Sequence, residues 1–176
     1  MLIHLRRAVL TSLIFFLLLG LAYPLVETAI GQTLFSQTAN GSLTSYGSTL
    51  IGQKWVGPKW FQGRPDSYNP MASGGTNLGP RSKQLVTDVK KQIAILKKEG
   101  ITPTPDLVTT SGSGTDPDIT PTDAYAQANA VAKARNLPIK VVDHLIAANT
   151  HQPQFGFLGS TYINVLQLNL ALAKTK

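Results

Sequence analysis

The chain has no cysteine among its 176 residues. Disulfide bonds, thiolate metal sites and cysteine nucleophiles are therefore excluded. Charge is also scarce, since charged residues make up 14% of the sequence against about 25% in an average soluble protein. The shortage is local, because no charged residue lies between Arg7 and Glu27. At roughly 100–200 residues per domain, the length allows one domain and one additional segment.

The uncharged stretch at residues 8–26 predicts a transmembrane helix. Its 19 residues would rise about 1.5 Å each and span roughly 28 Å, close to the roughly 30 Å hydrocarbon core of a bilayer. Tyr23 suits the interface, and Pro24 suits the end of the helix. The alternative is a cleaved signal peptide, whose apolar region usually has about 7–15 residues before a small-residue cleavage site. Glu27-Thr28-Ala29 matches such a site poorly, so we prefer a retained anchor.

Basic residues are distributed unequally around this stretch. Arg6 and Arg7 precede it directly, whereas the first basic residue after it is Lys54. Since positively charged flanks stay in the cytoplasm, we expect residues 1–7 inside the cytoplasm and residues 27–176 outside it. The exported part carries 14 basic and 9 acidic residues, a formal charge of +5. We interpret this excess as a solvated surface or as attraction to anionic membrane lipid, and we expect no nucleic-acid binding.

The first third of the exported part is predicted to lack helices. Residues 27–45 are polar and small, and we expect them to connect the anchor to the domain. Short apolar clusters at residues 50–52 and 55–56 are compatible with strands and turns. Residues 57–81 contain five glycines and four prolines, too many for a helix, and they predict loops.

Residues 82–99 form the clearest predicted helix, because one apolar stripe recurs there at spacings of four, four and three. Gly100 is a natural stop for it. Lysines in its C-terminal half suit the helix dipole, and we interpret them as a solvated face in preference to a binding patch. The stripe consists of Leu85, Val89, Ile93 and Leu96; the lysines are Lys90, Lys91, Lys97 and Lys98.

Two further helices are predicted beyond an irregular connector at residues 102–120. Thr120 and Asp123 form a capping pattern with a proline between them, so one helix should run to about Asn136. Apolar positions at residues 141–146 predict the next helix.

The C-terminal region favours a strand that ends at about Val165 and is followed by a helix, which Asn164 could cap. The expected fold class is therefore a mixed α/β (α+β) extracytoplasmic domain on a single N-terminal transmembrane helix.

The polar loop at residues 111–118 is the strongest candidate for chemistry. Ser111 or Ser113 would need an oriented base to act as a nucleophile, and the sequence has neither a G-x-S-x-G elbow nor a phosphate-binding G-K-[ST] loop. Asp116 and Asp118 could hold a hard cation through their oxygen atoms, although a turn built by Asp and Gly explains them more simply. None of the histidines has the spacing of a zinc helix motif; they are His4, His144 and His151.

A second glycine-rich loop lies at residues 73–80. Its glycines permit positive φ angles and close approach of backbones. The loop is either a docking site for a partner or a demanding turn before the helix at residue 82. Exposed aromatic side chains would favour docking, and buried ones the turn. These aromatics are Trp55, Trp60, Phe61 and Tyr68.

Short motifs in a fixed order cover nearly the whole chain, from the end of the anchor to the C-terminal helix. Each is weak alone, but the ordered series is specific. The motifs are Ala39–Leu43, Leu50–Gln53, Phe61–Pro65, Tyr68–Pro70, Ala72–Leu78, Ser111–Pro117, Gln127 with Val131–Leu137, and Ile163–Leu172.

This series resembles the KdpC family, the small single-span subunits of the bacterial Kdp potassium-transporting P-type ATPase. The resemblance implies a non-catalytic subunit of a high-affinity potassium importer in a prokaryotic plasma (inner) membrane. Its partners would be a channel-like potassium-binding subunit and a P-type catalytic subunit. The family assembles or stabilises the complex and raises the ATP affinity of the catalytic subunit, with no cofactor of its own. In keeping with a non-catalytic role, the sequence lacks the Asp-Lys-Thr-Gly phosphorylation signature of P-type ATPases.

The resemblance also marks Gln127 as a nucleotide contact. This chain departs from the family nearby, because Ala130 stands where an arginine is usual three residues later. A guanidinium that could pair with phosphate is therefore missing. The alternative for Gln127 is a helix residue that is hydrogen-bonded to neighbouring backbone. A direct ATP-binding regulator would also require the reverse membrane orientation.

The leading hypothesis is a membrane-anchored accessory subunit. The alternative from another class is a stand-alone, membrane-anchored hydrolase or cation-binding module that uses the Ser111–Asp118 loop.

Overall fold

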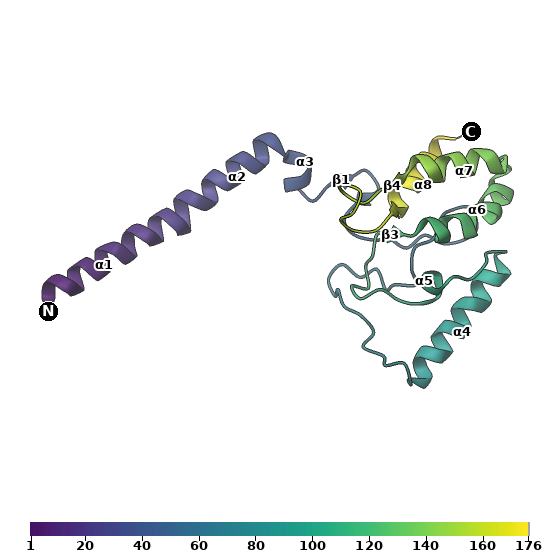
Figure 1. The fold of residues 1–176 in the computed structure, drawn as a ribbon, viewed down its shortest axis with the longest axis horizontal. Helices are drawn as coiled ribbons and strands as arrows, with labels where there is room; N and C mark the ends of the chain where they lie inside the picture. Colours follow the sequence, from purple (N-terminus) through teal and green to yellow (C-terminus); the bar gives the residue numbers. More distant parts are fainter. Residues whose placement is uncertain (176) are drawn as a thin grey trace. The chain divides into compact units, whose positions relative to one another are not determined.

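The computed structural model describes residues 1–175 and divides into two compact units, with the boundary between Leu43 and Thr44. The first unit contains a 33-residue apolar helix, Leu2–Leu34, which has the length and composition needed to cross a membrane. It comprises α1 (Leu2–Leu17), the π-helical turn η1 (Leu18–Ala22) and α2 (Tyr23–Leu34), shown at the purple end of Figure 1. A short helix, α3 (Ser36–Ala39), follows. The predicted single apolar N-terminal helix is confirmed.

The end expected for this helix at Pro24 is wrong, as is the connector expected from residue 27, because α2 continues to Leu34. Proline has no N–H, and its ring collides with the carbonyl four residues earlier in a regular α-helix. The π turn directly before Pro24 widens the backbone, so that Tyr23 N–H bonds to Leu18 O, five residues back. This local widening lets the helix pass through the proline.

The second unit combines short strands with helices. Two strands of two residues, β1 (Leu43–Thr44) and β2 (Gly47–Ser48), pair with each other, and the unit boundary falls within β1. Residues 49–82, all described, contain neither helix nor strand, so the predicted loops are confirmed and strands at residues 50–52 and 55–56 are excluded. The remaining elements are α4 (Lys83–Lys98), α5 (Pro105–Val108), β3 (Asp118–Ile119), α6 (Pro121–Arg135), α7 (Ile139–Ala148), β4 (Thr150–His151), β5 (Tyr162–Asn164) and α8 (Val165–Lys174).

A three-stranded antiparallel sheet brings distant parts of this unit together. Its order is β3-β5-β4, with β5 in the centre. Ile163 of β5 pairs with Ile119 of β3 on one side and with Thr150 of β4 on the other. The predicted C-terminal strand and helix are confirmed, with the strand ending at Asn164.

The helix starts predicted from the caps Thr120 and Asn164 are confirmed, and α4 also begins at a capping residue. The Ser82 side chain accepts a hydrogen bond from Leu85 N–H at the start of α4. Thr120 and Asp123 form a reciprocal capping box at the start of α6. The Asn164 side chain accepts from Gln167 N–H and caps α8. Each cap satisfies an N–H group that lacks a partner within its helix.

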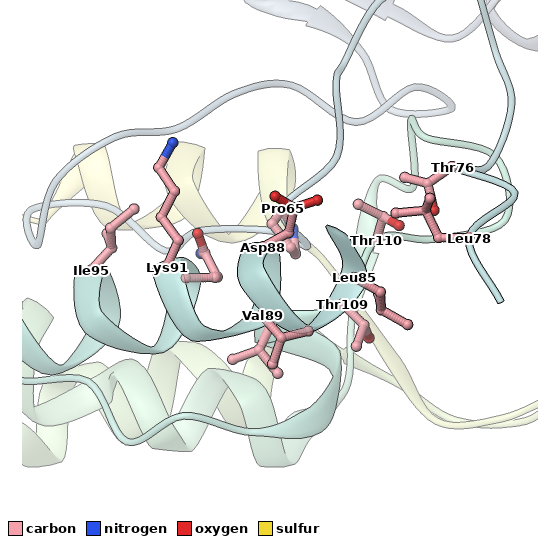
Figure 2. Close-up of a pocket in the computed structure, with 12 residues that line it drawn as sticks. Pro65, Thr76, Leu78, Leu85, Asp88, Val89, Lys91, Ile95, Thr109 and Thr110 are labelled. Atoms are coloured by element: carbon pink, nitrogen blue, oxygen red, sulfur yellow. The ribbon is translucent and has the colours of Figure 1, made fainter. Parts of the chain in front are cut away.

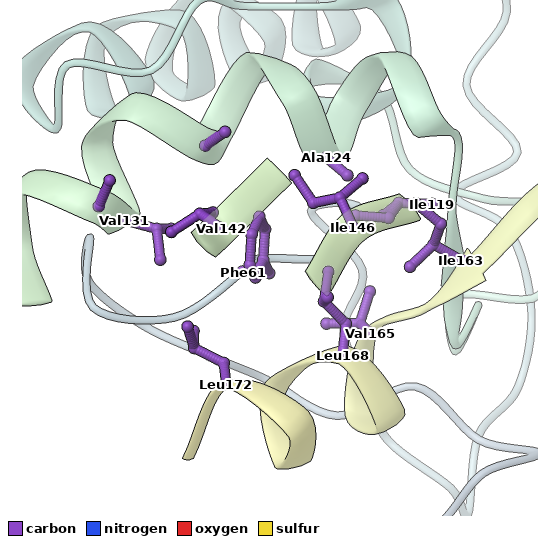
Figure 3. Close-up of a cluster of buried hydrophobic side chains, with 12 residues drawn as sticks. Phe61, Ile119, Ala124, Val131, Val142, Ile146, Ile163, Val165, Leu168 and Leu172 are labelled. Carbon is purple, nitrogen blue, oxygen red and sulfur yellow. The ribbon is translucent and has the colours of Figure 1, made fainter. Parts of the chain in front are cut away.

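One apolar core lies between α6, α7, α8 and the sheet (Figure 3). Phe61 comes from the irregular region and is fully buried in this core. The small alanines on α6 allow α7 to approach closely. The other buried members are Ile119, Ala124, Ala128, Val131, Ala132, Val142, Ile146, Ile163, Val165, Leu168 and Leu172.

The helix α4 is attached mainly at its C-terminal end. Leu96 is fully buried against Ile101, Leu107 and Ala130. The rest of the predicted apolar stripe is only half-buried. Leu85 and Val89 of this stripe line a groove of about 290 Å³ that runs along α4. Figure 2 shows this groove, which α4 lines on one side and residues 108–110 line on the other.

Candidate functional site

Two buried amide side chains hold the irregular region against the helices. Asn169 of α8 accepts a hydrogen bond from Phe61 N–H at 2.9 Å and donates one to Phe61 O at 2.9 Å. Gln127 of α6 accepts from Gln62 N–H at 2.7 Å and donates to Gln62 O at 3.0 Å. Both amides are completely buried. They therefore replace the backbone partners that an extended segment would find in a sheet. We call Gln127 and Asn169 the amide clamp.

This geometry bears on the predicted nucleotide contact of Gln127. Its amide nitrogen also donates to Asp123 O at 3.3 Å, so both N–H groups are used within the domain. The geometry matches the alternative of hydrogen bonding to backbone, with the addition that the main partner, Gln62, lies 65 residues away in the sequence. The contact with ATP stays a prediction.

A buried carboxylate organises the Ser111–Asp118 loop. Asp66 accepts hydrogen bonds from Ser111 N–H at 2.7 Å, from Ser111 Oγ at 2.6 Å and from Asp116 N–H at 3.0 Å. Ser111 Oγ in turn accepts from Gly114 N–H at 2.9 Å. The Ser111 hydroxyl thus donates to a carboxylate and accepts from backbone, and Ser111 is only 8% exposed. This arrangement is that of a structural turn, not of a nucleophile beside an imidazole base.

The two glycine-rich loops contact each other. Gly74 N–H donates to Ser113 O at 2.7 Å, and the Ser73 hydroxyl donates to the same oxygen at 3.0 Å. A Cβ added to Gly114, where φ is +68°, would lie 2.6 Å from Gly74 O. This close approach explains why glycine is needed at that position. The two alternatives for residues 73–80 were a docking site for a partner and a turn that requires glycine. The observed contacts within the domain are those of a turn that requires glycine.

Three of the four aromatic side chains expected to mark a docking surface lie in or against the core instead. Phe61 is fully buried, and Trp55 and Trp60 pack beside it with ring centroids 5.0 Å apart. The Arg135 guanidinium lies 4.3 Å from the centre of the Trp60 ring. Burial, together with the nearby carboxylate of Asp66, raises the pKa of Tyr68. These positions favour the turn interpretation of the neighbouring loop.

The aspartates beside β3 do not form a cation cage. Asp116 accepts from Asp118 N–H at 3.0 Å, and Asp118 accepts from Asn164 Nδ2 at 2.9 Å. Burial raises the pKa of Asp118, the charge of Asp116 adds to that rise, and the Asn164 hydrogen bond opposes it. Among the described residues, no three His, Cys, Asp or Glu side chains are placed to hold a metal ion together.

The histidines lie outside the hydrogen bonds of this network, although the charge of His151 lowers the pKa of Asp118. His144 is exposed on α7. His151 stacks on Tyr162 with ring centroids 4.9 Å apart, and its Nε2 lies 3.2 Å from Gln167 Oε1. His4 belongs to α1.

Sequence reasoning missed Asp66 and Asn169. Asn169 is three residues from both Leu166 and Leu172, which are buried on the same face of α8. A polar residue at an apolar position of a helix is a signal for a buried hydrogen-bonded side chain. Asp66 follows Pro65 in a loop and offers no comparable signal, because its partners lie 45 to 50 residues away.

Comparisons with known proteins agree over most of the chain. The sequence model of a family described as KdpC, K+-transporting ATPase, c chain, matches residues 5–174. A potassium-transporting ATPase KdpC subunit of Burkholderia ambifaria is 52% identical over 167 residues, which cover 87% of this chain and 86% of that protein. A KdpC subunit of Caulobacter vibrioides is 46% identical over 184 residues (98% and 93% covered), and one of Acidobacterium capsulatum is 46% identical over 179 residues (96% and 97% covered).

Proposed function

The chain belongs to the KdpC family and is thus a non-catalytic subunit of a potassium-transporting ATPase, and from this premise we propose that it assembles and stabilises that complex. One observation carries the proposal. The polar motif residues Gln127 and Ser111 bond to the domain's own groups: Gln127 to the backbone of Gln62, and Ser111 to the side chain of Asp66. These groups hold a rigid shape and leave the outer surface for binding to partners.

The partners in this proposal are a channel-like potassium-binding subunit and a P-type catalytic subunit. The apolar helix Leu2–Leu34 supplies a membrane anchor that can pack against the spans of such subunits. Van der Waals packing between helices and lipid entropy would drive this association in the bilayer.

We propose that the domain lies outside the cytoplasm and the N-terminus inside. Arg6 and Arg7 support this orientation, since no basic residue follows the apolar stretch until Lys54. The absence of cysteine makes the test direct, because any engineered cysteine is unique in the chain. Met71 is 92% exposed in the domain, and Leu2 is 84% exposed at the start of α1.

Intact cells that carry Met71→Cys should react with a membrane-impermeant maleimide. Cells that carry Leu2→Cys should react only after the membrane is permeabilised. The opposite pattern would place the domain in the cytoplasm and overturn the proposed orientation.

We further propose that any effect of this subunit on ATP affinity is transmitted through the shape of the domain and not through contact of Gln127 with nucleotide. The buried, fully engaged amide of Gln127 supports this view. Gln127→Glu keeps the acceptor for Gln62 N–H but loses the donors to Gln62 O and Asp123 O. It should lower the stability of the domain, and the KM for ATP of the assembled complex should change only in proportion to the loss of bound subunit. A raised KM in a fully assembled complex would contradict the proposal.

The assembly role is tested by co-purification. The complete chain with an affinity tag should retain the other subunits of the transporter, and cells should take up potassium at micromolar external concentrations. A chain in which residues 2–34 are replaced by an unrelated transmembrane helix should retain less of the complex. Full assembly and uptake without this chain would reject the proposal.

A further inference from the structure

An unusual cluster of apolar side chains projects from the loop between β4 and β5. Phe155 is 86% exposed, Phe157 is 75% exposed and Leu158 is 50% exposed. We call these three residues the apolar tip. By contrast, Ile163 in β5, which follows this loop, is fully buried. The tip therefore contributes little to the core, and its exposure of apolar surface to water is unfavourable in free energy.

The backbone of the tip is closed on itself. Gln154 and Leu158 exchange two hydrogen bonds, each of 2.9 Å, and Gly156 N–H donates to Pro153 O at 3.0 Å. Phe157 N–H donates to Gln154 O at 3.2 Å. These bonds fix the turn without help from the Phe side chains. The surface offered to a ligand consists of the side chains, not of free backbone groups.

Phe155 occupies the left-handed region of the backbone, with φ at +54°. This conformation is unfavourable for a bulky residue, and a glycine would adopt it without strain. Phe155 thus combines a strained backbone conformation with a solvent-exposed aromatic side chain. Neither feature stabilises the fold, and both are explained if the side chain binds a partner.

The base of the loop is firmly connected to the core. His151 stacks on Tyr162 across β4 and β5, and the neighbouring pair joins Thr150 to Ile163. Ile163 is completely buried in the core. A preorganised loop of this kind loses little conformational entropy when it binds.

The charge pattern favours a protein partner over a lipid surface. No Asp, Glu, Lys or Arg occurs between Asp143 and Lys174. Segments that bind the membrane surface usually combine apolar residues with Lys or Arg, which attract anionic headgroups. An uncharged aromatic tip is instead complementary to an uncharged apolar pocket.

The size of the tip favours a partner that is already held nearby. Two Phe side chains bury roughly 300–500 Å² together, whereas a stable interface needs roughly 800 Å² per partner. The tip alone is too small for a dimer of this chain. It suits an anchor within a larger assembly, because the membrane helix raises the effective concentration of partners in the same complex.

We propose that the apolar tip inserts into an uncharged apolar pocket on another subunit of the transport complex. This inference rests on the proposed function, since it takes the partner from the complex that the chain is proposed to assemble. Phe155 and Phe157 are the anchors, and Leu158 covers the side of the same pocket.

The test uses the complete chain, tagged and co-expressed with the other subunits. The double variant Phe155→Ser and Phe157→Ser should weaken retention of the complex by at least about tenfold on dilution, as expected when aromatic anchors are truncated. Met71→Ser removes another highly exposed apolar residue and should leave retention unchanged. If the double variant and the wild type retain the complex equally well, the apolar tip does not insert into another subunit. This result would leave the proposed function unaffected. Loss of retention in the wild type itself would overturn the proposed function.

A second measurement does not depend on the folding of the Ser variants. A photo-crosslinking benzoylphenylalanine placed at position 155 keeps an aromatic side chain at the tip. Light should join it to another subunit of the transporter, and the same residue at position 71 should give no such product. A product with lipid or with a second copy of this chain would overturn the proposal.

Discussion

The helices α6, α7 and α8 bury aliphatic side chains against one another, whereas the glycine-rich residues 49–82 and 109–117 bury mainly backbone and polar groups. In the helical region, many van der Waals contacts share the stabilisation. In the glycine-rich region, a few groups carry it: the Asp66 carboxylate, close contacts of glycines, and the amide clamp. A domain can therefore have a conventional core and still depend, over a large part of its chain, on single hydrogen-bonded residues.

Phe61 and Gln62 connect the two regions. Phe61 places its ring in the helical core, and the backbone of both residues is held by Asn169 and Gln127. Replacing the ring tests whether the glycine-rich region depends on this connection.

The largest effect is expected for Phe61→Ala. Removal of a fully buried aromatic ring should lower the free energy of unfolding by about 3–5 kcal/mol. Urea unfolding of the complete chain in detergent, followed by the fluorescence of Trp55 and Trp60, would measure it. Phe155→Ala removes the same ring from an exposed position and should change the value by less than about 0.5 kcal/mol. Similar values for both variants would show that Phe61 does not join the regions.

Asp66→Ala should follow, with a loss of about 2–4 kcal/mol, because three donors lose their acceptor in a buried site. Hydrogen exchange of the amides of Ser111 and Asp116 should accelerate with the loss of global stability. The exposed Asp88 on α4 provides the control, since Asp88→Ala should be close to neutral. Unchanged exchange in Asp66→Ala would refute the role assigned to the carboxylate.

Gly52→Ala should cost about 1–3 kcal/mol. An added Cβ would lie 2.3 Å from Asp116 O, a backbone atom that cannot move freely. Gly112→Ala is the matched control, because nothing lies within 4 Å of its added Cβ. Thermal unfolding of the two variants side by side would separate a steric requirement from a general preference for glycine. Equal melting temperatures would contradict the close contact.

The smallest effect concerns pH. Burial and the charge of Asp116 raise the pKa of Asp118 in the fold. The folded state therefore binds a proton at this carboxyl more tightly than the unfolded state does. The contribution of this carboxyl is fully favourable below the ordinary pKa of an aspartate and is lost as pH rises through the raised pKa. The side chain of Asp118→Asn stays neutral at every pH. The melting temperature of this variant minus that of the wild type should therefore increase from pH 4 to pH 7, by at most about 2 °C. If this difference decreased over the same interval, the pKa of Asp118 would be lowered in the fold and not raised.

Prediction from the sequence worked where the determinants are local. The starts of α6 and α8 follow from Thr120 and Asn164, since a cap depends on residues within one turn. The candidate site was harder. Gln127 and the Ser111 loop were found, but Asp66 and Asn169, which bond Ser111 and Phe61, were not.

The passage of the N-terminal helix through Pro24 was also missed. A regular α-helix does not tolerate that proline, and only the π turn at Leu18–Ala22 removes the conflict. The half-exposed stripe of α4 is a similar case. Its period predicts a helix, but whether another element covers it depends on the rest of the chain.

The sequence by itself determined the apolar N-terminal helix, the main helices α4, α6, α7 and α8, the loop character of residues 57–81 and the family, whereas the short helices α3 and α5 lie where connectors were expected. These follow from composition, periodicity and short motifs, which act over a few residues. Only the tertiary structure decided that Gln127 forms hydrogen bonds with the backbone of Gln62 and that Asp66 organises the Ser111 loop. It also decided that the side chains of Phe155 and Phe157 are exposed to solvent. The physical reason is that a buried polar group takes whichever partner the folded chain brings to it, and that partner can lie more than a hundred residues away, as Asn169 does from Phe61.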